Sequence, residues 1–263
     1  MSRLSAYLYS FAKGRDYKMI WTENYRVSAQ DVDFDRVASA SAMMRFMQDT
    51  ANCHMEGAGP SYDELFDSGR AFIIARFAAD FLAPLHSHDE IDVETWAAPS
   101  RAASFNRCYR VLRGGEVIAC ASSVWALVDT KSGALLRVEE CGIDYGVDDA
   151  LEVVSPIRFR IPADAPLREV GRHIVTYADV DVNRHMNNTK YADLLCSHLP
   201  DEGGRPALEG RRVGSLSIAY SAEAPLGGEI AIYHAECDGA HWFRTVREDG
   251  KTNVEARIVL VEI

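Results

Sequence analysis

Residues 177–200 read YADVDVNRHMNNTKYADLLCSHLP, and the organisation of the whole chain follows from this stretch. Its first half places polar side chains at nearly alternate positions, namely Asp179, Asp181, Asn183, His185, Asn187 and Asn188. Its second half predicts a helix, because large side chains recur at the three- and four-residue spacing of one helical face. These are Tyr191, Leu194, Leu195 and His198. Asn187 or Asn188 favours the helix start, since a short amide side chain accepts hydrogen bonds from the first free N–H groups.

The beginning of this stretch repeats an earlier one. Residues 25–37, YRVSAQDVDFDRV, align without a gap with residues 173–185, HIVTYADVDVNRH. A helical pattern follows both copies, and the first is the longer one. It carries apolar side chains at helical spacing from Val37 to Met55 until Gly57, Gly59 and Pro60 end it. The chain is therefore predicted to contain one structural unit twice.

Strand patterns follow each helical pattern. After the first helix, β-branched and aromatic residues predict antiparallel strands over 71–80, 90–96, 104–112 and 117–128. After the second, they predict strands over 213–220, 229–235, 241–247 and 254–263. A sheet of this kind must bury its apolar face, and a helix is the element that covers it. We therefore expect an α+β fold with two tandem units, each a long helix wrapped by an antiparallel β-sheet.

The segment between the two copies predicts a linker. Residues 144–166 include Pro156, Pro162 and Pro166 among small and acidic residues. We place the boundary near residue 145, which gives an N-terminal unit over 1–145 and a C-terminal unit over 146–263.

Composition excludes several classes of function. The 263 residues are 48% hydrophobic and 25% charged, which is ordinary for a globular protein. The net charge of −11 argues against a general nucleic-acid or anionic-membrane binder, because both need a basic surface. The six cysteines form no CxxC pair, so we expect no metal site, dithiol motif or other cofactor. Without a signal-peptide pattern or an apolar window long enough to span a bilayer, the chain is expected to be cytoplasmic.

The polar cluster lies where a loop turns into a helix. Backbone N–H groups there lack helical partners and carry the positive end of the helix dipole, so they stabilise an oxygen that gains negative charge. Capping alone explains any one of these polar residues, whereas the whole cluster indicates a functional site. The first copy has Asp35 and Val37 where the second has Asn183 and His185, so only the second keeps the amide and the imidazole.

Two tandem helix-and-sheet units with Asp-x-Asn-x-His-x-Asn-Asn-x-x-Tyr at residues 181–191 resemble the acyl-acyl-carrier-protein thioesterases of plants and bacteria. That family has a double hotdog fold. The resemblance covers nearly the whole chain and includes VETW at 93–96, ASSVW at 121–125 and YSAE at 220–223. The plant members have a cysteine directly after that glutamate, where this chain has Ala224. They commonly have a tryptophan where this chain has Leu194.

The resemblance implies hydrolysis of a fatty acyl thioester by an activated water, without a cysteine nucleophile. Glu223 is expected to be the general base, and His185 to orient the water or protonate the leaving thiolate. Which of the two takes the first proton stays open. Asn183 would donate a hydrogen bond to the water or the carbonyl, and Asp181 would fix the orientation of Asn183 or His185. One catalytic site per chain is expected, in the second unit.

The resemblance also implies a substrate pocket and a docking surface. The pocket is expected to involve Met43, Met44, Met47 and Trp96 in the first unit, and Asn187, Asn188 and Tyr191 in the second. Plain core packing is the alternative explanation for the methionines. The acyl-carrier protein is strongly acidic, so docking needs cations. The candidates are Arg184, Lys190, Arg211 and Arg212, with a merely solvated surface as the alternative. A monomer and a homodimer are both compatible with the sequence.

Three other functions share parts of this pattern. An acyl-CoA thioesterase would use the same site and differ in what holds the pantetheine. A hotdog dehydratase also pairs a histidine with a carboxylate, and its product would carry an enoyl group. A non-catalytic acyl-thioester sensor would bind without turnover and would not need Asn183, His185 and Glu223 together.

Overall fold

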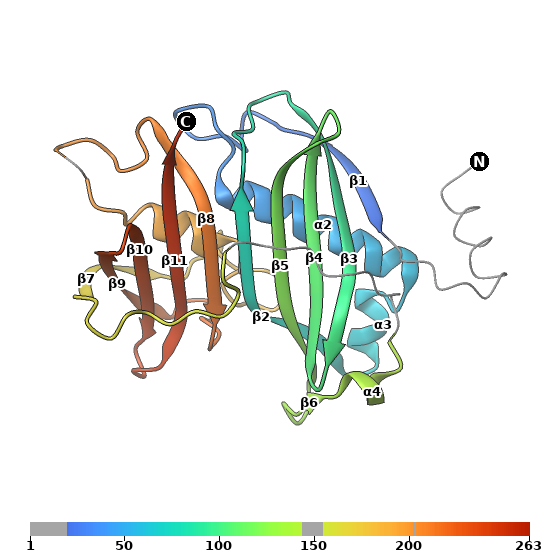
Figure 1. The fold of residues 1–263 in the computed structure, drawn as a ribbon. Coiled ribbons are helices and arrows are strands. Elements are labelled where there is room, and N and C mark those ends of the chain that lie inside the picture. The colour runs from blue at the N-terminus through green and yellow to red at the C-terminus, as the bar shows by residue number, and fades with distance from the viewer. Residues whose placement is uncertain (1–19, 144–154, 202) are drawn as a thin grey trace.

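The computed structural model describes residues 20–143, 155–201 and 203–263, and within these ranges the strands form one 11-stranded sheet (Figure 1). The strands of the first half are β1 (Trp21–Arg26), β2 (Arg70–Phe81), β3 (Glu90–Arg101), β4 (Ser104–Arg113), β5 (Glu116–Asp129) and β6 (Leu135–Leu136). Those of the second half are β7 (Arg168–Ile174), β8 (Arg211–Tyr220), β9 (Glu229–Cys237), β10 (Ala240–Arg247) and β11 (Thr252–Glu262). The helices are α2 (Ala40–Ala58), α3 (Tyr62–Asp67), α4 (Val138–Cys141) and α5 (Lys190–Cys196).

The two halves of the sheet have the same strand order. The sheet runs β1-β3-β4-β5-β2-β8-β11-β10-β9-β7, and β6 pairs with β5. Counted from the centre of the sheet to its edge, the first half runs β2-β5-β4-β3-β1 and the second half runs β8-β11-β10-β9-β7. Numbering β7–β11 from one to five gives the same order in both halves. The halves join where β2 and β8 pair antiparallel, from Arg76 opposite Ala219 to Asp80 opposite Ser215. The predicted repeat is therefore confirmed, and its two copies share one continuous sheet.

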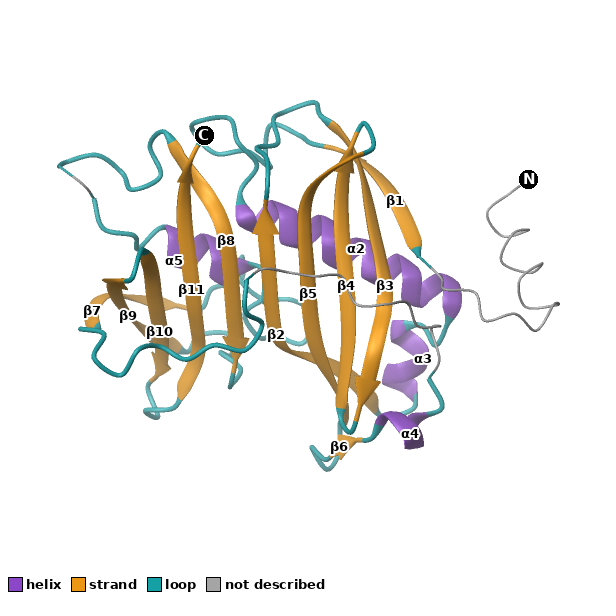
Figure 2. Cartoon of the chain, in the orientation of Figure 1, coloured by secondary structure: helices purple, strands orange, loops and turns teal. Residues whose placement is uncertain are grey.

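Helix α2 forms where the apolar spacing predicted it and covers the first half of the sheet (Figure 2). The Ser39 hydroxyl caps its start by accepting the N–H of Ala42, and Gly59, at a φ of 62°, ends it. Met44 and Met47 are completely buried and pack into a core that also contains Phe77 of β2. Burying each such side chain stabilises the fold by about 1.5–3 kcal/mol.

Helix α5 is much shorter than expected. It has seven residues against the 19 of α2, so the second unit lacks the long helix that the sequence pattern suggested. Its Tyr191 and Leu195 are buried in the shared core as predicted. The helix ends at Cys196, because Pro200 has no N–H to donate to the Cys196 carbonyl and its ring would clash with that carbonyl in a continuing helix.

The predicted unit boundary near residue 145 lies outside the described residues, so the bounds of the two units stay a prediction. Where the description resumes, Ser155 is bonded to Asp80 of β2, and both its N–H (3.0 Å) and its hydroxyl (2.5 Å) donate to that carboxylate. The chain entering the second unit is thus fastened beside the β2–β8 junction. In the described part of the chain, no helix combines the length and apolar character needed to cross a membrane.

Candidate active site

The loop over residues 176–187, here called the second-copy loop, is held by its own aspartates. The Asp179 carboxylate accepts the N–H and the hydroxyl of Thr176, each at 2.7 Å. The N–H of Asp181 donates to the carbonyl of His185 at 3.1 Å. Arg184 has a φ of 61°, a left-handed conformation that reverses the chain between these bonds. His185 is therefore positioned by the loop itself.

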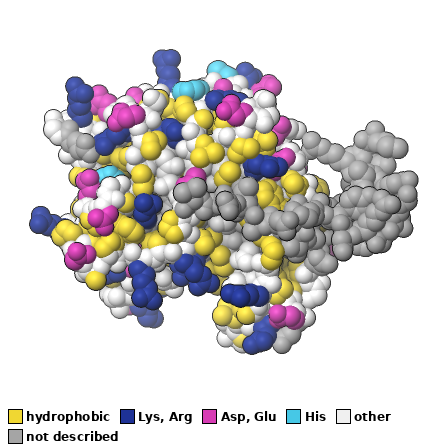
Figure 3. All heavy atoms as spheres, viewed as in Figure 1, with side chains coloured by type: hydrophobic (Ala, Val, Ile, Leu, Met, Phe, Trp, Pro, Cys, Tyr) yellow, Lys and Arg dark blue, Asp and Glu magenta, His cyan; other side chains and the backbone are white. Residues whose placement is uncertain are grey.

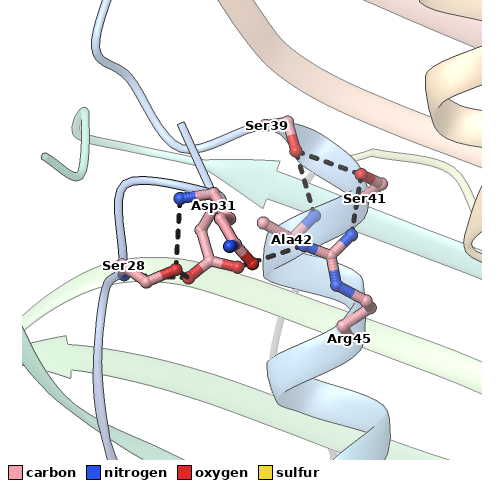
Figure 4. Close-up of polar contacts among 7 residues, drawn as sticks. Ser28, Asp31, Ser39, Ser41, Ala42 and Arg45 are labelled. Atoms are coloured by element: carbon pink, nitrogen blue, oxygen red, sulfur yellow. Dashed lines mark hydrogen bonds and ion pairs between the residues drawn. The ribbon is translucent and has the colours of Figure 1, made fainter. Parts of the chain in front are cut away.

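The first-copy loop, residues 28–39, has the same internal bonding (Figure 4). The Asp31 carboxylate accepts the N–H and the hydroxyl of Ser28, at 2.9 and 2.7 Å. Arg36, in the place of Arg184, has a φ of 63°. In Figure 4, Asp31 also binds Arg45 of α2, at 3.1 Å. The two loops are thus structural equivalents, and they differ in the side chains they present.

Backbone pairing brings His185 and Glu223 together. The N–H of Met186 donates to the carbonyl of Ala224 at 2.8 Å, which fastens the second-copy loop to the segment following β8. The Nδ1 of His185 then lies 3.2 Å from an Oε of Glu223, and their side chains are 35% and 61% exposed. Arg247 fixes the Glu223 backbone by donating to its carbonyl at 3.0 Å. An imidazole and a carboxylate in contact with each other and with solvent can together activate a water.

Asp181 and Asn183 lie in the same loop. A carboxylate oxygen of Asp181 accepts the backbone N–H of Asn183 at 2.8 Å, so Asp181 shapes the loop that carries the amide. The Oδ1 of Asn183 accepts a hydrogen bond from the hydroxyl of Tyr62 at 3.3 Å. Sequence reasoning missed Tyr62, because it lies 121 residues away and belongs to α3 of the first unit.

Three expected substrate-binding residues have structural roles at the start of α5. Neither asparagine is the N-cap of α5, which is Thr189; Asn187 instead holds the turn before the helix, with its Oδ1 accepting the N–H (3.0 Å) and the hydroxyl (2.8 Å) of Thr189. The carbonyl of Asn188 accepts the hydroxyl of Tyr220 at 3.0 Å. Tyr191 packs edge-on against Tyr220, and burial raises the pKa of its hydroxyl to about 12. These residues hold the loop in place, and a role in binding substrate stays a prediction.

The structure separates Trp96 from the methionines with which it was expected to form a pocket. Met43, Met44 and Met47 belong to the main core, whereas Trp96 lies in a small separate cluster with Cys108. Successive residues of a strand point to opposite faces, and Val93 of β3 faces the main core, so Trp96 faces the other side. A small cavity of about 20 Å³ touches Met43.

The first copy has lost all three reactive side chains. The N–H of Ala38 donates to the carbonyl of Leu85 at 2.8 Å, which is the counterpart of the bond between Met186 and Ala224. Pro84 therefore stands where the second copy has Glu223. Pro84 thus replaces the carboxylate of Glu223, Asp35 replaces the amide of Asn183, and Val37 replaces the imidazole of His185.

A larger cleft of about 540 Å³ opens beside the first-copy loop, at the boundary of the two units. Its lining includes Ser39 and Arg45 from the first unit and Asp193 and Arg212 from the second. It lies beside the copy that lacks the reactive groups, so its position does not identify the site. We propose that the site lies instead at His185 and Glu223, where an imidazole contacts a carboxylate.

Among the described residues, neither position considered for a thiolate nucleophile near Glu223 supplies one. Ala224 stands directly after Glu223, and the thiol of Cys196 on α5 is partly buried. Burial raises the pKa of Cys196 to about 12, and the carboxylates of Asp193 and Asp33 act in the same direction. A protonated thiol is a poor nucleophile, so water is the nucleophile that this arrangement favours.

The expected docking cations fall into two groups. Arg184 and Lys190 lie in or next to the second-copy loop. Arg211 and Arg212 begin β8, and its ten residues separate them from Glu223 by roughly 30 Å. Arg212 also donates to the carbonyls of Phe81 (2.7 Å) and Leu82 (3.3 Å), so its guanidinium joins the two units. Figure 3 shows Lys and Arg side chains spread over the face it draws, along its upper edge as well as in its lower part.

Family models match both halves of the chain. The acyl-ACP thioesterase N-terminal domain matches residues 18–143, and the acyl-ACP thioesterase C-terminal domain matches residues 168–260. Among curated relatives, a chloroplastic acyl-(acyl-carrier-protein) hydrolase of Cuphea viscosissima is 26% identical over 219 residues. That alignment covers 78% of this chain and 52% of the relative, so the chain spans about half the length of the curated relatives it matches.

Two solved structures have the same fold. An acyl-ACP thioesterase from Bacteroides thetaiotaomicron superposes with a TM-score of 0.82 at 19% identity, covering 92% of this chain and 98% of that one. A 12:0-ACP thioesterase from Umbellularia californica gives a TM-score of 0.78 at 19% identity, with coverages of 93% and 98%. The likeness at these identities is one of fold, and it confirms the expected double hotdog.

Proposed function

Because this chain belongs to the acyl-ACP thioesterase family, we propose that it hydrolyses a fatty acyl thioester of acyl-carrier protein to the free fatty acid and the carrier protein. The observation that carries the proposal is the 3.2 Å contact between His185 and Glu223 beside the loop of Asn183. This pair supplies a base and an acid at one solvent-accessible place.

The proposed reaction needs no covalent enzyme intermediate. A water held between Glu223 and His185 loses a proton to one of them as its oxygen attacks the thioester carbonyl, and the resulting oxyanion receives hydrogen bonds. The C–S bond then breaks, and the proton passes to the departing pantetheine thiolate. The Nδ2 group of Asn183 is our candidate donor to the water or to the oxyanion, a contact of a kind typically worth about 10²–10³ in rate.

We assign one site to each chain, in the second unit. In the first unit, Pro84 replaces the glutamate, Val37 the imidazole and Asp35 the amide donor, so the imidazole–glutamate pair and the amide are missing at the equivalent place. The acyl chain is assigned to the first unit, along the methionines of α2. Their flexible thioethers adapt to an inserted alkyl chain, and the cavity beside Met43 is the starting point for such an opening.

Carrier docking is assigned to the cations nearest the reactive pair. Arg184 is exposed at the tip of the second-copy loop, and Lys190 begins α5. Arg211 and Arg212 lie at the other end of β8, so they contribute only if the carrier covers that whole length. A positive surface at the site would steer an acidic carrier and weaken with salt.

Location and assembly stay predictions. The Cuphea relative is chloroplastic, whereas for this chain we expect the cytoplasm. The two units already pair as a hotdog pair within one chain, so both a monomer and a homodimer are compatible with a complete site.

The test is a hydrolysis panel on the purified chain. Carrier-protein thioesters of short to long acyl chains, and the same acyl chains on CoA, are incubated with wild type, Glu223→Ala and Glu229→Ala. Release of free thiol gives the rate, and mass spectrometry identifies the acid. Glu229 is a matched control, because it is a partly exposed carboxylate of the same unit, paired with Arg172 at 2.7 Å.

We expect wild type and Glu229→Ala to release free fatty acid from the carrier, and Glu223→Ala to be at least a hundredfold slower. Preference for CoA over the carrier would reassign the substrate. An enoyl product would indicate a dehydratase. Tight binding without turnover would indicate a sensor and refute the hydrolase proposal.

A further inference from the structure

Tyr62 belongs to the first unit but contacts the candidate active site of the second. Its hydroxyl donates to Oδ1 of Asn183 across 3.3 Å. This contact links the first unit, which lacks the imidazole and the amide, to the loop of the second unit that carries both.

Tyr62 is held firmly at the start of α3. Ser61 caps this helix, and Ser61 and Glu64 form a reciprocal capping box. The N–H of Tyr62 donates to the carboxylate of Glu56 at 3.1 Å, and its ring stacks on Phe66 with centroids 6.4 Å apart. The hydroxyl is therefore presented from a fixed support.

The contact decides which end of the Asn183 amide is available. An asparagine side chain has an acceptor oxygen and a donor NH₂ of nearly the same shape, and its neighbours determine their orientation. Asp181 fixes the Asn183 backbone at 2.8 Å, and Tyr62 occupies the amide oxygen. The Nδ2 hydrogens are then the part left for a water or a developing oxyanion.

We propose that Tyr62 is a positioning residue that orients the Asn183 amide for thioester hydrolysis, so that the first unit completes the second unit's active site. The proposal rests on the function proposed above. It assigns Tyr62 no direct contact with the reacting atoms. Its effect should pass entirely through Asn183.

The first copy shows the corresponding contact without the chemistry. Asp35, in the place of Asn183, accepts the backbone N–H of Gly210 of the opposite unit at 2.7 Å. In both copies the opposite unit therefore contacts this loop position. A carboxylate has no donor left after such a contact, whereas an amide keeps its NH₂ group.

The test compares wild type, Tyr62→Phe, Asn183→Ala and the double variant Tyr62→Phe/Asn183→Ala, with acyl-carrier-protein thioester as substrate. Tyr233→Phe is the matched control, because the Tyr233 hydroxyl on β9 makes an equally long, exposed bond of 3.3 Å, to Glu169 outside the second-copy loop. Thermal unfolding of each variant and separate values of kcat and KM accompany the rates. The Tyr62 hydroxyl bond is exposed, so removing it should leave the unfolding temperature nearly unchanged.

We expect Tyr62→Phe to lower kcat about three- to tenfold with unchanged KM, the rate equivalent of about 0.7–1.4 kcal/mol. In the Asn183→Ala background the same substitution should have no further effect, and Tyr233→Phe should match wild type. An unchanged kcat, or an equal loss in both backgrounds, overturns the role of Tyr62 and leaves the hydrolase proposal intact. Wild-type protein that turns over no acyl thioester overturns both.

Discussion

Replacing His185 by alanine tests whether the chemistry belongs to the second copy alone. His185 and Glu223 are 35% and 61% exposed, so their contact adds no more than about 1 kcal/mol to stability. For a chain of this size, such a loss lowers Tm by only about 2–4 °C. Hydrolysis should nevertheless fall at least a hundredfold, which corresponds to about 2.7 kcal/mol of transition-state stabilisation.

A second imidazole–carboxylate pair in the same unit provides the control. The Nε2 of His173 on β7 lies 3.0 Å from the Asp179 carboxylate, and Asp179 keeps its bonds to Thr176 when the imidazole is removed. His173→Ala should therefore change Tm about as much as His185→Ala and change kcat less than twofold.

The assay measures thiol release at saturating acyl-carrier-protein substrate, together with thermal unfolding of each variant. Equal rate losses in the two variants would show that any disturbance of the second unit impairs turnover. A fully active His185→Ala would remove the imidazole from the mechanism. Either result refutes the assignment of His185.

Three further predictions concern the first copy, the docking surface and the pH dependence of stability. Val37→Ala should lower Tm, because Val37 is buried, and leave kcat unchanged in the same thiol-release assay. Arg184→Glu should raise KM for the carrier-linked substrate more at low than at high salt. Arg212→Gln should instead lower Tm and leave KM unchanged, because the Arg212 guanidinium donates to the carbonyls of Phe81 and Leu82. Burial and the nearby Arg107 cation lower the pKa of His54 to about 3, so the folded state binds fewer protons than the unfolded state between about pH 3 and 6.5. The unfolding free energy should therefore be largest above about pH 6.5 and fall on the order of 2 kcal/mol between pH 7 and 5, with a flatter profile for His54→Gln in denaturant titrations at both pH values.

Several features followed from the sequence because their causes are local. Runs of β-branched and aromatic residues predicted four strands in each half, and the helical spacing of Met44 and Met47 predicted α2. The repeated loop could also be read directly, since Asp31 and Asp179 bind residues three positions earlier in the chain. Asn183 and His185 stood out in a local cluster of polar residues, and the difference between the two copies at these positions assigned the site to the second copy.

Local patterns were misleading about which face of a strand a residue occupies and about where the second helix ends. Trp96 was grouped with the methionines, although the alternation that buries Val93 places it on the opposite face of β3. The apolar spacing after Asn188 suggested a long second helix, but the helix ends at Cys196, whose carbonyl cannot bond to Pro200 four residues later.

By itself, the sequence determined the repeat, four strands of each half, the long first helix and the identity of the copy that keeps an amide and an imidazole. These features follow from composition and side-chain periodicity over a few residues. Only the tertiary structure decided that Pro84 is the counterpart of Glu223, that Arg212 joins the units, and that Tyr62 meets Asn183 from 121 residues away. Those contacts depend on how β2 and β8 pair and how the loops dock across them, and no spacing within either unit encodes that arrangement.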